Sequence, residues 1–228
     1  MLEKSVLLTL YDRLYTTYGP QNWWPAETPF EVMAGAVLTQ NTAWINVEKA
    51  INNLKRANCL TPERVLSLDD KHLARLIKPS GYFNIKARRL KNLCAWLPDK
   101  QGYQNKRRWR TEKLRESILS VNGIGPETAD DILLYAFQRP VFVIDVYSRR
   151  LLARLGLING NENYETLRAY FENALPADVP LYNEFHALIV RHAKEKCNKN
   201  EKTRGRKSNQ DIRIDNCRHC YVERMKST

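Results

Sequence analysis

The stretch from Val121 to Asp145 reads VNGIGPETADDILLYAFQRPVFVID, and its first half could bind an anion. Gly123 and Gly125 flank Ile124, and Pro126 follows them. Glycine permits positive φ and lets a ligand approach the backbone without a Cβ in the way. The N–H groups at the start of a helix lie at the positive end of its dipole and suit a phosphate. The residues predict a phosphate-binding turn between two helices, with an ordinary tight helical hairpin as the alternative.

Asp145 ends the same stretch, after the short apolar run 141–144. A carboxylate can stabilise an oxocarbenium-like transition state or activate the attacking water when a glycosidic bond is cleaved. Aspartate is also a favoured helix N-cap, and residues 147–155 have helical periodicity. The two interpretations are compatible, so Asp145 is a candidate for both roles.

Apolar residues recur at helical spacing along almost the whole chain, which predicts the elements that position these residues. Thr61 and Pro62 are typical of a helix start, as N-cap and first helical residue. No alternating run is long enough to form a sheet, so the sequence predicts an all-α fold. Residues 111–137 are expected to form a helix–hairpin–helix in which Ile124 anchors the turn in the core.

The charge of the chain points to a polyanion. The 228 residues carry a formal net charge of +12, concentrated in two regions. Residues 84–116 hold eleven basic and three acidic side chains, and residues 194–228 hold eleven and five. Clustered positive charge is typical of nucleic-acid binding, because each neutralised phosphate releases a counterion, although a solubilising surface is the alternative. No segment has transmembrane length and no signal-peptide pattern is present, so we expect a cytoplasmic protein without a membrane partner.

The hairpin pattern, the later aspartate and the segment Gly35–Thr42 (GAVLTQNT) together resemble the endonuclease III (HhH-GPD) superfamily of base-excision DNA glycosylases. The resemblance covers roughly residues 23–197. It implies that Gly123, Ile124, Gly125 and Thr128 bind the DNA backbone. It also implies that Asp145 is catalytic and that Gln40 fills the gap left by the flipped nucleotide.

The resemblance also implies a two-lobed fold with the flipped base in the cleft between the lobes. One helical lobe is expected to combine residues 1–29 and 141–197, and the other to comprise residues 30–140. Residues 198–228 are expected to form a basic C-terminal loop or tail. We expect a monomer of bacterial or archaeal type, associated with the nucleoid, whose partner is double-stranded DNA with a damaged base. A non-catalytic protein that binds DNA through the hairpin alone is the rival interpretation.

Glu127 narrows the reaction that the resemblance implies. Bifunctional members of the superfamily carry a lysine at this position, which attacks the sugar and forms a Schiff base before the strand is cut. A carboxylate cannot form an imine. The sequence therefore predicts a monofunctional glycosylase without abasic-site lyase activity.

Three tryptophans, Trp23, Trp24 and Trp44, are candidates for a base pocket. Tryptophan stacks on a flipped base and offers the strongest cation–π face to a charged alkylated purine, although tryptophans are commonly part of a core. Together with residues 78–87 they are similar to the 3-methyladenine glycosylase branch of the superfamily. Mismatched thymine, uracil and adenine opposite oxidised guanine are the alternative substrates.

The C-terminal cysteines form an incomplete set. Many members of the superfamily hold a [4Fe–4S] cluster with four cysteines, which is the usual ligand number. Here Cys197 lies at about the expected place and Cys217 and Cys220 have the expected two-residue spacing, but nineteen residues separate Cys197 from Cys217 and Lys226 stands where the fourth cysteine should fall. His219 or a borrowed ligand could complete a cluster site, but a degenerate site without a cofactor is favoured.

Overall fold

The structure is a computed structural model that describes residues 3–197. Within that range every regular element is a helix and no strand occurs, which confirms the predicted all-α class. The described chain divides into two compact units, residues 3–23 with 140–197 and residues 24–139. No helix in the described part is long and apolar enough to span a membrane.

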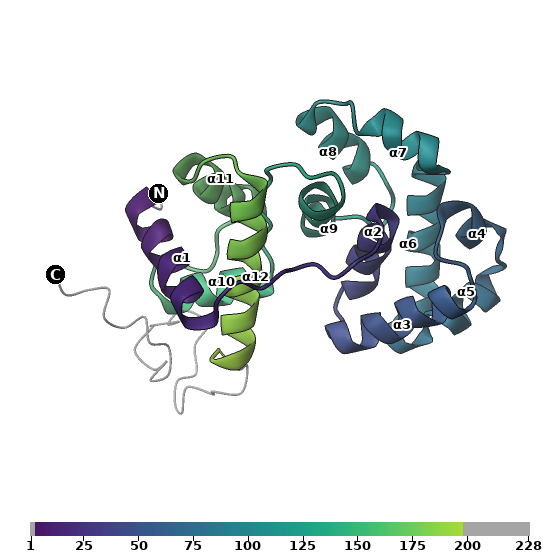
Figure 1. Cartoon of the computed structure of the whole chain (residues 1–228), viewed down its shortest axis with the longest axis horizontal. Helices are drawn as coiled ribbons and strands as arrows, with labels where there is room; N and C mark the ends of the chain where they lie inside the picture. The colour runs from purple at the N-terminus through teal and green to yellow at the C-terminus, as the bar shows by residue number, and fades with distance from the viewer. Residues whose placement is uncertain (1–2, 198–228) are drawn as a thin grey trace. The chain divides into compact units, whose positions relative to one another are not determined.

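The first unit contains four helices (Figure 1). They are α1 (Lys4–Tyr18), α10 (Val146–Arg154), α11 (Tyr164–Ala174) and α12 (Val179–Glu195). An aromatic cluster forms its core, in which the rings of Phe142 and Phe171 stack with centroids 3.9 Å apart and Tyr182 and Phe185 meet Phe142 edge-on. Helix α12 packs against both α1 and α10, so it joins the N-terminal helix to the later part of the chain.

The second unit is built around α2 (Figure 1). Its other elements are α3 (Trp44–Arg56), α4 (Pro62–Ser67), α5 (Asp70–Leu76), η1 (Lys78–Ser80), α6 (Phe83–Trp96), α7 (Lys100–Lys106), α8 (Thr111–Leu119), α9 (Pro126–Asp131) and η2 (Ile132–Ala136). Helix α2 itself (Pro29–Thr39) is buried on every side from Phe30 to Leu38, where α3, α6, α9 and η2 cover it. A helix that is apolar all round must be enclosed in this way.

Side-chain caps define where many of these helices begin. Thr61 accepts a hydrogen bond from the Arg64 N–H with Pro62 in the first turn, as the sequence predicted. The same device starts α2, α5, α7, α10, α11 and α12, at Thr28, Asp69, Asp99, Asp145, Asn163 and Asp178. These side chains satisfy N–H groups that have no partner within the helix.

Candidate active site

The hairpin between α8 and α9 has the geometry that its glycines suggest. Gly123 has a φ of +93°, a backbone conformation that side chains disfavour, whereas Gly125 is extended at −94° and caps α9. The side chain of Ile124 is buried, as the sequence predicted. The turn is closed by the Ile124 N–H, which donates to the Val121 carbonyl over 3.1 Å.

The two glycines differ in what surrounds them. A Cβ at Gly123 would lie 2.3 Å from Arg89 Cγ, so the Arg89 side chain lies directly on the hairpin. A Cβ at Gly125 would meet nothing within 4 Å. Gly123 is therefore required by the protein's own packing, while Gly125 leaves open space beside the backbone.

Gln40 is hydrogen-bonded to this hairpin. It follows the last residue of α2, and its Nε2 donates to the Gly123 carbonyl over 3.1 Å and to Thr128 Oγ1 over 3.0 Å. Its Oε1 accepts from Arg89 Nη1 over 2.5 Å. The structure thus brings together Gln40, Gly123 and Thr128, which the sequence singled out separately, and adds Arg89, which it did not.

An ion pair ties the two hairpin helices to each other. Arg115 of α8 donates to both oxygens of Asp130 of α9, over 2.7 and 3.1 Å, and the Asp130 side chain is fully buried. Such a two-point contact fixes geometry as well as charge. Glu127, by contrast, is exposed in the first turn of α9.

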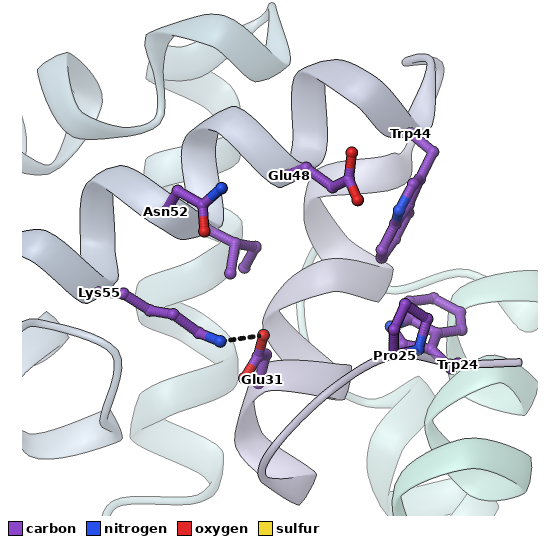
Figure 2. Close-up of a pocket in the computed structure, with 8 residues that line it drawn as sticks. Trp24, Pro25, Glu31, Trp44, Glu48, Asn52 and Lys55 are labelled. Atoms are coloured by element: carbon purple, nitrogen blue, oxygen red, sulfur yellow. Dashed lines mark ion pairs between the residues drawn. The ribbon is translucent and has the colours of Figure 1, made fainter.

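Trp24 and Trp44 line a cavity of about 150 Å³ in the second unit (Figure 2). Their rings meet edge-on with centroids 5.0 Å apart, and Trp24 also contacts Tyr135. The rest of the lining comes from Pro25, Glu31, Glu48, Ile51, Asn52 and Lys55. Lys55 pairs with Glu31 over 2.8 Å, whereas Glu48 on the same wall forms no ion pair with any residue from 3 to 197. The cavity is therefore aromatic on one side and acidic on the other.

Asp145 caps α10 in the first unit, and its carboxylate is buried. Oδ1 accepts from the Ser148 N–H over 2.7 Å and from Ser148 Oγ over 2.9 Å. Oδ2 lies 3.6 Å from His186 Nε2, close enough for an ion pair when the imidazole is protonated. Burial raises the pKa of Asp145, but His186 and the two Ser148 donors outweigh burial and leave that pKa below its ordinary value. The group is therefore an ionised carboxylate at neutral pH.

Lys194 of α12 lies close enough to Asp145 to interact with its charge. Lys194 Nζ is 5.5 Å from the ring centroids of both Trp23 and Tyr147. Burial lowers the pKa of Lys194, and the attraction of Asp145 opposes that effect only in part. Trp23 is thus placed beside Lys194, in a different unit from Trp24 and Trp44.

Sequence reasoning missed His186 and Lys194 as neighbours of Asp145. They lie eight residues apart on α12, a spacing that puts both on one face of a helix. That spacing was a usable signal, but it cannot say which segment the face covers.

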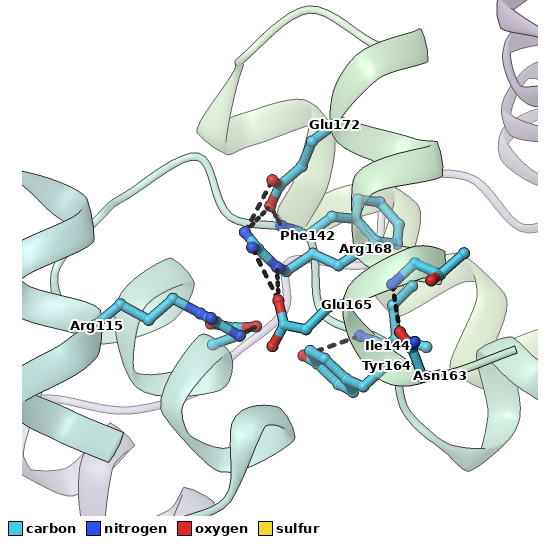
Figure 3. A network of polar contacts seen from close by, with 10 residues as sticks. Arg115, Phe142, Ile144, Asn163, Tyr164, Glu165, Arg168 and Glu172 are labelled. Carbon is cyan, nitrogen blue, oxygen red and sulfur yellow. Dashed lines mark hydrogen bonds and ion pairs between the residues drawn. The ribbon is translucent and has the colours of Figure 1, made fainter. Parts of the chain in front are cut away.

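The segment that leads to Asp145 is held by side chains instead of a sheet (Figure 3). The Phe142 N–H donates to Glu172 Oε1 over 2.9 Å, and Arg168 binds the same carboxylate over 3.0 and 2.9 Å. Two residues on, the Ile144 N–H lies 3.5 Å from the Tyr164 hydroxyl. Helix α11 therefore supplies the polar partners that this buried, extended backbone needs.

Of the three candidate cluster ligands, Cys197 lies within the described residues. Cys197 is buried, and its carbonyl accepts from Arg150 over 3.0 Å. Cys217 and Cys220 lie outside the described residues. Within residues 3–197 no group of three or more His, Cys, Asp or Glu side chains is arranged to hold a metal ion.

Comparison with known proteins gives a consistent result. Residues 34–177 match the model of the "HhH-GPD superfamily base excision DNA repair protein" family. A protein of Methanocaldococcus jannaschii named "Putative DNA repair glycosylase MJ1434" is 47% identical over 199 residues, which cover 86% of this chain and 90% of that protein. Endonuclease III of Sulfolobus acidocaldarius is 28% identical over 74% of each chain.

Two solved structures illustrate the similarity in three dimensions. The 3-methyladenine DNA glycosylase of H. pylori (MagIII), bound to 1,N6-ethenoadenine, is 33% identical with a TM-score of 0.72, over 86% of this chain and 99% of that one. An endonuclease III–DNA complex has a TM-score of 0.73 at 21% identity, over 88% and 90% of the two chains. At that identity the second match speaks for the fold alone.

Proposed function

This chain belongs to the HhH-GPD superfamily of base excision DNA repair proteins and is a DNA glycosylase, and we propose that it removes an alkylated purine of the 3-methyladenine type without cutting the strand. The observation that carries the proposal is Asp145, a buried carboxylate with a lowered pKa at the start of α10. Its negative charge is suited to an oxocarbenium-like sugar.

The cavity beside Trp24 and Trp44 supports the choice of base. An N3-alkylated purine is cationic, so it gains from cation–π contact with tryptophan and from the nearby Glu48 carboxylate. A cationic purine also leaves without being protonated first, so an aspartate without a dedicated general acid is sufficient. The similarity to the H. pylori 3-methyladenine DNA glycosylase, at 33% identity, favours the same substrate class.

The DNA backbone is proposed to bind at the hairpin. The first-turn N–H groups of α9 and the open space beside Gly125 suit a phosphate. We propose that Gly123, Ile124, Gly125 and Thr128 form this contact and that Gln40 leaves its place on the hairpin to fill the gap in the duplex. We further propose that the protein acts as a monomer in the cytoplasm and needs no cluster.

A lesion panel tests the function. Enzyme in excess is mixed with duplexes that carry 3-methyladenine, 1,N6-ethenoadenine, uracil, a thymine–guanine mismatch, or adenine opposite 8-oxoguanine, and released base is measured by chromatography. We expect the fastest release from the 3-methyladenine duplex. Release of uracil, thymine or adenine instead would assign the chain to another substrate class of the same fold. No release from any duplex would favour the non-catalytic rival.

A further inference from the structure

The hairpin lacks a positive charge of its own. Residues 121–131 contain three acidic side chains, Glu127, Asp130 and Asp131, and no basic one. Arg115, the nearest arginine on α8, is bound to Asp130 by two hydrogen bonds. Backbone N–H groups can orient a phosphate, but they bring no full positive charge to it. A phosphate site at this hairpin therefore needs a cation from another element.

Arg89 of α6 is placed to supply that cation. Its Cγ, Cδ and Nε lie 2.3, 2.8 and 3.0 Å from the point where a Gly123 Cβ would stand, so the side chain runs along the hairpin. Its guanidinium makes one hydrogen bond within the described part of the chain, to the neutral amide of Gln40, and no ion pair there. A guanidinium has five N–H donors in a planar fork, which leaves donors for a phosphate.

The surroundings of Arg89 carry further positive charge. Lys86, one turn earlier on α6, is buried and donates to the carbonyls of Leu38 and Ser80 over 2.8 and 2.6 Å. Burial, and secondly the charge of Arg89, lower the pKa of Lys86 to about 8. The two cations repel each other, so an anion that binds Arg89 relieves this repulsion.

We propose that Arg89 is a phosphate-binding residue: it holds a DNA backbone phosphate against the hairpin, and Gln40 positions its guanidinium before DNA binds. The inference rests on the DNA-binding part of the proposed function. It does not require that any base be released. In the unbound protein, Gln40, which is proposed to fill the gap, is hydrogen-bonded to Arg89, which is proposed to bind the backbone.

The test is the salt dependence of binding to an undamaged duplex, measured by fluorescence anisotropy between about 50 and 200 mM salt. Arg89→Gln keeps the first methylenes of the stem and an amide that can donate to Gln40, but removes the charge. The slope of log K against log salt is negative, and loss of one phosphate contact decreases its magnitude by about 0.9. We expect that decrease in Arg89→Gln and a wild-type slope in Arg89→Lys, because lysine keeps the charge.

Arg88→Gln is the matched control, since Arg88 is the exposed neighbour of Arg89 on the same helix. We expect this variant to keep the wild-type slope. An unchanged slope in Arg89→Gln, or an equal decrease in both glutamine variants, would overturn the proposal. If Arg89→Gln did not fold, Arg89→Met, which keeps an apolar stem and removes the charge, carries the same test, and a wild-type slope in that variant would overturn the proposal. The duplex is undamaged, so failure of the lesion panel leaves this result independent.

Discussion

Asp145 has a structural role and a proposed catalytic role, and the two involve different atoms. Oδ1 receives both Ser148 donors and caps α10, while Oδ2 faces His186. A cap needs an acceptor oxygen, whereas stabilisation of a cationic sugar needs a negative charge. Substitutions that keep one property and remove the other can therefore separate the two roles.

Asp145→Asn tests the catalytic role. Asparagine is as good an N-cap as aspartate, so we expect the variant to keep the cap and to lose only the stability that the lowered pKa of Asp145 contributes at neutral pH. The rate of base release under single-turnover conditions should fall by about a hundredfold or more, because the charge is lost. Asp145→Ala is the control for the cap and should cost about 1 kcal/mol of stability in denaturant titrations. Wild-type release by Asp145→Asn would rule out the carboxylate as the catalytic group.

Comparison of wild type with Asp145→Asn also predicts how the stability of the protein changes with pH. Because the pKa of Asp145 is lowered in the folded state, ionised Asp145 stabilises the protein above its unfolded-state pKa, about 3.9. That contribution is lost as pH falls through the lower, folded-state pKa. The stability difference between wild type and Asp145→Asn should therefore be constant from about pH 8 to pH 5 and change only in more acidic solution.

The hairpin shows how one element combines two kinds of glycine. Gly123 is held in a positive-φ conformation beneath Arg89, so its small size serves packing inside the protein. Gly125 is extended and a Cβ there would meet nothing within 4 Å, so its lack of a side chain leaves room for a ligand. The Gly-Ile-Gly pattern thus has one structural and one recognition position.

Alanine at each glycine should separate these positions. Gly123→Ala forces both an unfavourable φ and a clash with Arg89, and should lower the free energy of unfolding by about 1–3 kcal/mol. Gly125→Ala should change stability by less than about 0.5 kcal/mol but weaken duplex binding, because its methyl group occupies the open space. Denaturant titration and DNA affinity measured on both variants check this. Unaltered DNA affinity in Gly125→Ala would show that no ligand approaches there.

The sequence was sufficient to predict the helices but not the contacts between them. Apolar periodicity, Thr61 with Pro62, and the glycines identified the all-α class and the buried Ile124 correctly. Periodicity says which face of a helix is buried, not which segment covers it. Gln40 meets Gly123 across 83 positions, and His186 reaches Asp145 from α12, so neither contact has a local signal.

The sequence did not predict the π-helical turn η2 (Ile132–Ala136) either. There the Phe137 N–H bonds to the Ile132 carbonyl, five residues back, over 3.1 Å. The apolar residues 132–136 fit an α-helical pattern as well as a π-helical one, and this turn packs against α2. Apolar periodicity alone therefore does not distinguish the two geometries where the hairpin's second helix continues.

At the scale of the whole molecule, whether base removal is followed by strand cleavage depends on which lysine amines can reach the sugar. An imine with the sugar requires a lysine that can lose its proton and reach the abasic carbon. Position 127 offers a carboxylate, and Lys86 is buried with three oxygen partners, Leu38, Thr42 and Ser80. Lys194 is different, because it interacts with Asp145 and has a lowered pKa.

We expect wild-type protein to give no borohydride-trapped adduct on a duplex with an abasic site, and to leave that strand intact until alkali is added. This expectation follows from Glu127, because a carboxylate cannot form an imine. Lys194 is the amine to test, since burial lowers its pKa and the attraction of Asp145 opposes that effect only in part. Denaturing gels of borohydride-treated wild type and Lys194→Met measure this directly. An adduct in wild type that disappears in Lys194→Met would identify Lys194 as a nucleophile and replace base removal alone with base removal followed by strand cleavage.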